Sequence, residues 1–155
     1  MMVNLVGLMK MNNLFDTNYE IAMQCLITLN TLKQKSLSTD RLWLINFLSL
    51  YAKDFNFSDN NLNGDSIYSK VQLSMKREKI KEVILLLITK NLIRFDDIQG
   101  INFTITESGQ KLVEKINSNF SIAYREATKN VCKSVKNMSD IELLDFTYKL
   151  IINKE

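Results

Sequence analysis

Apolar residues recur at intervals of three and four positions along most of this chain, which is the pattern of amphipathic helices. A first helix is predicted from about residue 16, because Thr17 and Glu20 form a capping box before the periodic stretch. The tripeptide Ser38-Thr39-Asp40 predicts the start of a second helix, which we expect to be buried on much of its circumference. Further helices are expected at about 67–90, 107–117, 120–137 and from 139 onwards.

Two short segments, residues 92–95 and 101–105, have the length of β-strands, and a polar Asp-Asp-Ile-Gln-Gly reversal connects them. Phe103 and Ile105 alternate with polar neighbours, as a strand with one buried face requires. A helix, a hairpin and another helix in this order are typical of a winged helix. We therefore predict a mainly α fold with a small β-hairpin, namely a winged-helix domain with additional N- and C-terminal helices.

The segment 83–88, Val-Ile-Leu-Leu-Leu-Ile, is apolar on all sides and predicts the buried central helix of the domain. Asn91 is expected to end that helix in the left-handed conformation. Thr106 is predicted to cap the helix after the hairpin, and Ser139 with Glu142 to form a capping box for the last helix. The inward stripe of that last helix is predicted to be Ile141, Leu144, Tyr148 and Ile151.

The length of 155 residues suits one domain with a single core. We expect residues 14–117 to form the winged-helix core and residues 118–155 a C-terminal helical extension packed on the same domain. Residues 1–13 lack the features of a signal peptide, and we interpret them as a disordered arm or an early translation start, with Met11 as the alternative start. No apolar run approaches the roughly 20 residues that span a bilayer, so we expect no membrane association and a cytoplasmic location.

The chain lacks the residues that several classes of catalytic and metal site require. The chain has no His, and its two cysteines, Cys25 and Cys132, stand alone and are expected to be buried in a reducing compartment. With four glycines in all, it has no phosphate-binding loop. The polar loop 54–66 resembles a calcium loop only superficially, since Asp59 and Asp65 stand where Gly and Glu are needed. We therefore expect no enzyme, no cofactor or metal, and no small-molecule substrate.

The net charge of +3 does not by itself indicate a nucleic-acid partner. A basic cluster precedes the hairpin and consists of Lys76, Arg77, Lys79 and Lys81. It could face phosphates, but we favour a solvated face, because Glu78 and Glu82 can pair locally with these lysines. The predicted wing is acidic, with Asp96 and Asp97, so phosphate repulsion would make it a poor DNA contact.

Other residues are candidates for contacts with a protein partner. Arg41 occupies the first turn of its helix, where a cation is unfavourable; this hints at a specific partner, although we favour a solvated arginine. The two C-terminal helices could either dock on a partner or close the domain's own core. One of them is predicted to present Phe120, Tyr124, Ala127, Val131 and Val135 on one face. The complete set of interface candidates is Arg41, Phe95, Asp96, Asp97, Ile98, Tyr124 and Tyr148.

The order of segments resembles the middle-component family of bacterial ABC-three-component systems, in particular the small subunit of Lamassu-type anti-phage defence. The matching pieces are 14–20, 38–42, Asp54-Phe55, 74–77 with the Leu-rich helix and 91–93, 100–107, and 138–142. The chain departs from the family pattern in having no Pro, and in carrying Tyr51 or Ala52 where a His is common.

This resemblance implies a non-enzymatic subunit that sits on an SMC or Rad50-like ABC ATPase. Such a subunit would help to hold a separate effector, often a nuclease, inactive. Such a subunit would contact nucleic acid only indirectly or weakly. The alternative hypothesis is a winged-helix transcription regulator, which would need a symmetric dimer and a basic reading surface.

Overall fold

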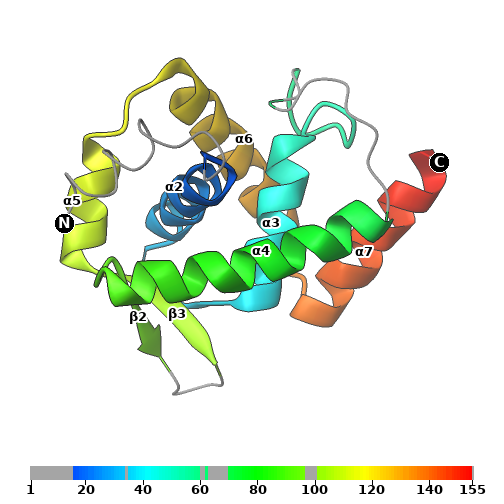
Figure 1. The fold of residues 1–155 in the computed structure, drawn as a ribbon. Coiled ribbons are helices and arrows are strands. Elements are labelled where there is room, and N and C mark those ends of the chain that lie inside the picture. Colours follow the sequence, from blue (N-terminus) through cyan, green and yellow to red (C-terminus); the bar gives the residue numbers. More distant parts are fainter. Residues whose placement is uncertain (1–15, 34, 60–61, 63–69, 97–100, 155) are drawn as a thin grey trace.

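The computed structural model describes residues 16–33, 35–59, 62, 70–96 and 101–154 (Figure 1). The predicted arm at 1–13, the wing residues Asp97 and Ile98, and part of the loop 54–66 lie outside the described residues. The described helices are α2 (Asp16–Thr31), α3 (Thr39–Leu50), α4 (Lys70–Thr89), α5 (Glu107–Glu114), α6 (Asn119–Val135) and α7 (Asp140–Lys154). The strands are β1 (Leu37–Ser38), β2 (Ile93–Asp96) and β3 (Asn102–Ile105). The protein is therefore mainly helical with a small antiparallel sheet.

The predicted hairpin is confirmed, and a third strand joins it. β2 and β3 pair antiparallel, with Ile93 opposite Ile105 and Phe95 opposite Phe103. β1 pairs with the other edge of β3, so the strand order is β1-β3-β2. The sequence did not predict β1, because two residues are too short to show an alternating pattern.

The core lies between α2, α3, α4 and α6, and α3 is its most enclosed element. Every residue from 42 to 50 is buried, as expected for a helix covered on most sides. α4 crosses in front of α3 (Figure 1) and is not the buried central helix that was predicted. Leu85 is 67% exposed and Ile88 is 36% exposed, because only one side of α4 faces the other helices.

Most local capping signals agree with the structure, but Thr17, which was predicted to open the first helix with Glu20, lies inside α2. The Ser38 hydroxyl accepts the backbone amide hydrogen of Arg41, and Thr106 caps α5 in the same way. Asn91 has the predicted left-handed conformation, with φ of 58°. Helix α5 ends at Glu114, about one turn earlier than predicted.

The C-terminal helices pack on the domain itself, with α6 against α2 and α3, and α7 against α3. On α6, Phe120 is 39% exposed, whereas the other four predicted face residues are buried. The stripe predicted for α7 is confirmed in part. Ile151 is fully buried, and Leu144 and Tyr148 pack against the core, but Ile141 is 80% exposed. Leu143 and Thr147, which the pattern did not include, are also fully buried.

Candidate protein-interaction surfaces

Arg77 ties α4 to α3 and does not face outward as one of a set of phosphate ligands. Its Nε donates to the Asp40 carboxylate at 2.8 Å, and its guanidinium lies 5.7 Å from the centre of the Trp43 ring. The indole Nε1 of Trp43 in turn donates to the main-chain oxygen of Leu73 on α4 at 2.8 Å. This basic side chain is thus committed to a contact between two helices.

The two exposed lysines of the basic cluster pair within their own helix, as the sequence predicted. Lys79 lies 3.8 Å from the Glu82 carboxylate, and Lys81 lies 3.2 Å from that of Glu78. Such exposed pairs stabilise a helix by only about 0.2–0.5 kcal/mol each. Their acidic partners reduce the positive potential that a phosphate would meet.

Lys76 occupies a third environment, half-buried where α4 passes α2. Burial lowers the pKa of Lys76 below its ordinary 10.5, although nearby Cys25 and Glu20 act in the opposite direction. The four basic residues therefore lie in three different settings along α4.

The hairpin presents apolar side chains to solvent. Phe95 is 53% exposed, and its ring meets the buried Phe103 edge-on with centroids 5.7 Å apart. Ile101 is 65% exposed at the start of the returning strand. Arg94 is held along the sheet, since its Nε donates to the Thr104 hydroxyl at 3.1 Å. A rigid aromatic side chain that is half-exposed is a common anchor in protein interfaces.

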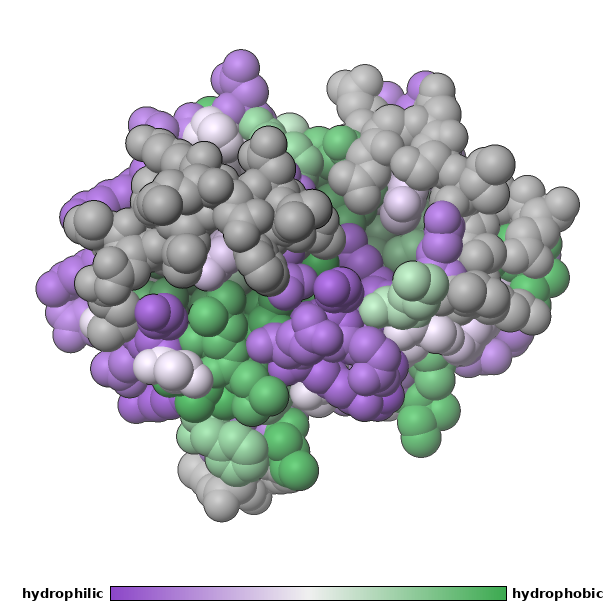
Figure 2. Space-filling view, viewed as in Figure 1, coloured by the Kyte–Doolittle hydropathy of each residue, from purple (hydrophilic) through white to green (hydrophobic). Residues whose placement is uncertain are grey.

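These hairpin residues continue into an exposed part of α4. Figure 2 shows hydrophobic residues gathered over the C-terminal half of α4 and down onto the hairpin, beside a charged region in the middle of the helix. We call this the hairpin–α4 surface, formed by Leu85, Ile88, Phe95 and Ile101. Sequence reasoning missed Leu85 and Ile88, because a continuous apolar run was interpreted as buried on all sides. Contiguous apolar patches on a surface mark interaction sites more often than isolated apolar residues do.

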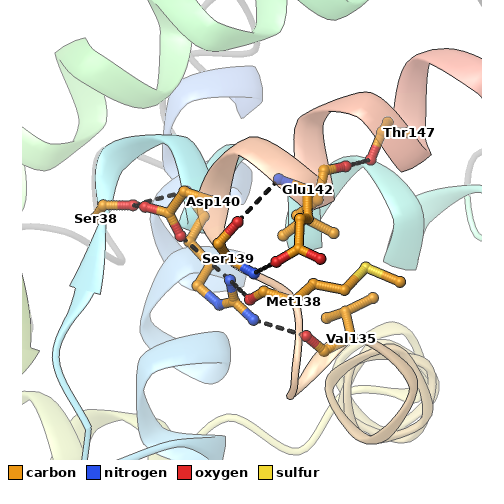
Figure 3. A network of polar contacts seen from close by, with 9 residues as sticks. Ser38, Val135, Met138, Ser139, Asp140, Glu142 and Thr147 are labelled. Atoms are coloured by element: carbon orange, nitrogen blue, oxygen red, sulfur yellow. Dashed lines mark hydrogen bonds and ion pairs between the residues drawn. The ribbon is translucent and has the colours of Figure 1, made fainter.

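Arg41, predicted as a solvated arginine or an interface residue, is bound within the chain, and Figure 3 labels its partners Val135, Met138 and Asp140. Its guanidinium donates to the main-chain oxygens of Val135 and Met138, each at 2.8 Å, and lies 3.2 Å from Asp140. Asp140 also accepts a hydrogen bond from the Ser38 hydroxyl at 2.6 Å. The unfavourable position of Arg41 at the start of α3 is offset by the carbonyls at the end of α6, where cations are favoured.

Tyr124 and Tyr148 are not free surface side chains either. Tyr124 is fully buried, so its prediction as an interface residue does not fit the folded chain. Its hydroxyl lies 3.0 Å from the Thr28 hydroxyl and accepts from the Asn46 amide at 3.1 Å. Tyr148 is half-buried and packs against the core. Asp96 is half-buried at the end of β2.

A polar network lies inside the helical core around Tyr124. Asn46 donates to the side-chain oxygen of Gln24 at 2.7 Å, and the Thr128 hydroxyl donates to that of Ser49 at 3.1 Å. All of these side chains are buried. Buried polar groups are costly unless hydrogen-bonded, so this network fixes the relative position of α2, α3 and α6. This network could not be predicted from the sequence, because its members are ordinary polar residues far apart in the chain.

The cysteines are buried and unpaired, as predicted. Burial raises the pKa of Cys25 from 9.0 to about 12 and that of Cys132 to about 11. Thiols that remain protonated at neutral pH are poor nucleophiles. Within the described residues, no group of three acidic or thiol side chains could hold a metal ion. None of the described helices is long and apolar enough to cross a bilayer.

The described chain is thus a small helical domain whose distinctive surface features are apolar. Residues 14–154 match the family model of ABC-three component (ABC-3C) system Middle Component 2. The chain therefore belongs to this family, which confirms the resemblance inferred from its segment order. The family name implies partnership with the other components of such a system. Searches of curated proteins and of solved structures found no match.

Proposed function

We propose that this protein is a non-catalytic accessory subunit of a bacterial anti-phage defence complex of the Lamassu type. It docks on an SMC or Rad50-like ABC ATPase and helps to hold an effector, often a nuclease, in position. The observation that carries this proposal is the family match over residues 14–154. The scarcity of catalytic groups in the sequence, which has no His, agrees with an accessory role.

We assign the region from α2 to α5 to a winged helix used for protein docking. The supporting observation is the chain order helix, strand, helix, helix, strand, strand, combined with the sheet order β1-β3-β2. In this arrangement α4 takes the place of the helix before the wing, and β2 with β3 forms the wing. The C-terminal helices α6 and α7 are an extension that closes the same core.

The hairpin–α4 surface is the proposed contact with the ABC component. Its four exposed apolar residues would lose their contact with water in a complex, at roughly 25 cal/mol per Å2 of apolar surface buried. The same surface disfavours DNA, because Lys79 and Lys81 on α4 are paired with acidic residues and Asp96 lies in the wing. These features also weigh against the alternative of a transcription regulator.

Co-expression with the ABC component encoded beside it, followed by size-exclusion chromatography, tests the proposal. We expect the wild-type chain to co-elute with that component, and Ile101→Asp to abolish co-elution. Ile141→Asp is the matched control, because Ile141 is also exposed and apolar but lies on α7. Migration of the wild-type chain as a free monomer or dimer would contradict the proposal. A salt-dependent shift of short duplex DNA by the chain alone would instead support the regulator.

A further inference from the structure

A hollow lies away from the hairpin–α4 surface, between α2 and the connection from α5 to α6. Its volume is about 710 Å3. The apolar lining consists of Met23 and Ile27 from α2, Ile116 from the connection and Phe120 from α6. Pockets that bind ligands or anchor residues commonly have volumes of about 300–1,000 Å3 and mostly apolar walls. We call this hollow the α2–α6 groove.

Two polar side chains of the groove are almost completely buried, with Gln24 4% and Ser121 2% exposed. The side-chain oxygen of Gln24 accepts a hydrogen bond from Asn46, which leaves its amide Nε2 without a hydrogen-bond partner among the described residues. The hydroxyl of Ser121 donates to the Ser118 carbonyl at 2.8 Å, so its oxygen can still accept. The groove therefore offers an inner donor and an inner acceptor.

An inner donor and acceptor between apolar walls match a peptide group that carries an apolar side chain. The peptide carbonyl would accept from Gln24, and the peptide amide hydrogen would be donated to Ser121. At the edge of the groove, Glu20 and Lys115 carry opposite charges, which suits a dipolar main chain better than a strongly charged ligand.

We infer that the α2–α6 groove receives a short peptide segment, with one apolar anchor side chain, from another component of the same system. This inference rests on the proposed function as an accessory subunit. A subunit that joins two other components needs two separate contact surfaces, and this groove would supply the second. The Phe120 ring would form one wall for the anchor, because it is stacked on the buried Tyr124 at 6.3 Å.

Photo-crosslinking in the full complex tests the inference. A benzoylphenylalanine replaces either Phe120 or Ile122, which is 50% exposed on the same helix and does not line the groove. We expect position 120 to crosslink to one short segment of another component, whereas position 122 does not. A crosslink only to residues 1–15 of this chain, to a small molecule, or to nothing would overturn the inference.

A synthetic peptide of the crosslinked segment then provides a quantitative measurement. We expect Phe120→Ala to weaken its binding to the full chain at least tenfold and Ile122→Ala to leave it within twofold. Met23→Ala serves as a second groove variant if Phe120→Ala lowers the melting temperature. If both groove variants bind the peptide as tightly as the wild-type chain does, the groove is not the peptide site, and the proposed function is unaffected. If the wild-type chain forms no complex at all, both proposals fail.

Discussion

The guanidinium of Arg41 near the start of α3 lies 3.2 Å from the carboxylate of Asp140 at the start of α7. The same guanidinium donates to the carbonyls of Val135 and Met138 on either side of the turn between α6 and α7. Ser38, which caps α3, also donates to Asp140. A single cation thus holds the C-terminal helices against the beginning of α3.

Replacement of Arg41 by Ala should destabilise the protein by about 2–4 kcal/mol, because hydrogen bonds from a charged donor contribute about 1.5–3 kcal/mol each. The measurement is urea-induced unfolding followed by circular dichroism. Arg94→Ala is the control, since Arg94 is exposed on β2 and should cost less than about 0.5 kcal/mol. Equal losses in both variants would show that the Arg41 contacts do not hold the helices together.

Gly109 on α5 should not tolerate even a methyl group. A Cβ at this position would lie 2.2 Å from the carbonyl oxygen of Leu92 and 2.7 Å from the Ile105 side chain. We expect Gly109→Ala to destabilise the fold by about 1–3 kcal/mol or more through overpacking. The neighbouring Ser108→Ala, at an exposed position, should be close to neutral in the same thermal unfolding assay. Wild-type stability of Gly109→Ala would mean that α5 can move away from the hairpin.

Lys76 should destabilise the folded chain at neutral pH. Burial lowers its pKa in the folded state below 10.5, so the unfolded state binds the extra proton more readily. The contribution of Lys76 to stability therefore improves as the pH rises from the lowered pKa to 10.5. We expect Lys76→Met to raise the melting temperature at pH 7, with a gain that shrinks toward pH 10.5. Exposed Lys149→Met is the control, and a lower melting temperature for Lys76→Met would refute the prediction.

Stability should fall in alkaline solution because of two buried acids. Burial raises the pKa of Cys25 from 9.0 to about 12, and it also raises that of Tyr124 above the ordinary 10.0. The protonated forms of Cys25 and Tyr124 contribute fully to stability below pH 9. This contribution is lost as the pH rises through their pKa values in the folded state, because the same groups ionise at lower pH in the unfolded chain. Urea unfolding between pH 7 and 11 in the Lys76→Met background measures this decline without the opposing lysine.

Tyr124→Phe separates the tyrosine from the cysteine in that experiment. At pH 7 the loss of its hydroxyl contacts with Thr28 and Asn46 should cost about 1–3 kcal/mol. Above pH 10 the decline should be shallower than in the parent, because no phenol remains to ionise. A decline as steep as that of the parent would show that Tyr124 does not contribute to the alkaline loss.

Helix boundaries and the hairpin could be predicted because their causes are local. Ser38, Thr106 and the Ser139–Glu142 pair satisfy backbone groups within three residues of themselves. Asn91 ends α4 through its own left-handed conformation. The alternating residues Phe103 and Ile105 carry the strand signal within β3 itself. Such interactions are visible in the sequence without knowledge of the rest of the fold.

The surfaces could not be predicted in the same way, because burial depends on which elements meet. The apolar run predicted a helix around Leu85, but it could not indicate which sides of that helix the other helices would cover. Leu85 remains 67% exposed. For the same reason, the pattern predicted that Ile141 would lie on the buried face of α7, whereas this side chain is exposed. Tyr124 was assigned to a helical face, but only the packing of α6 on α2 and α3 placed its hydroxyl inside the core.

By itself, the sequence determined the helical elements, the hairpin, their caps and the resemblance to the middle-component family, which the family match confirms. Tertiary structure alone decided that β1 joins the sheet and that the residues of the basic cluster separate. It also turned Arg41 inward to the carbonyls of Val135 and Met138. The physical reason is the range of the interactions: capping and periodicity act over one or two helical turns, whereas these contacts join segments that only folding brings together.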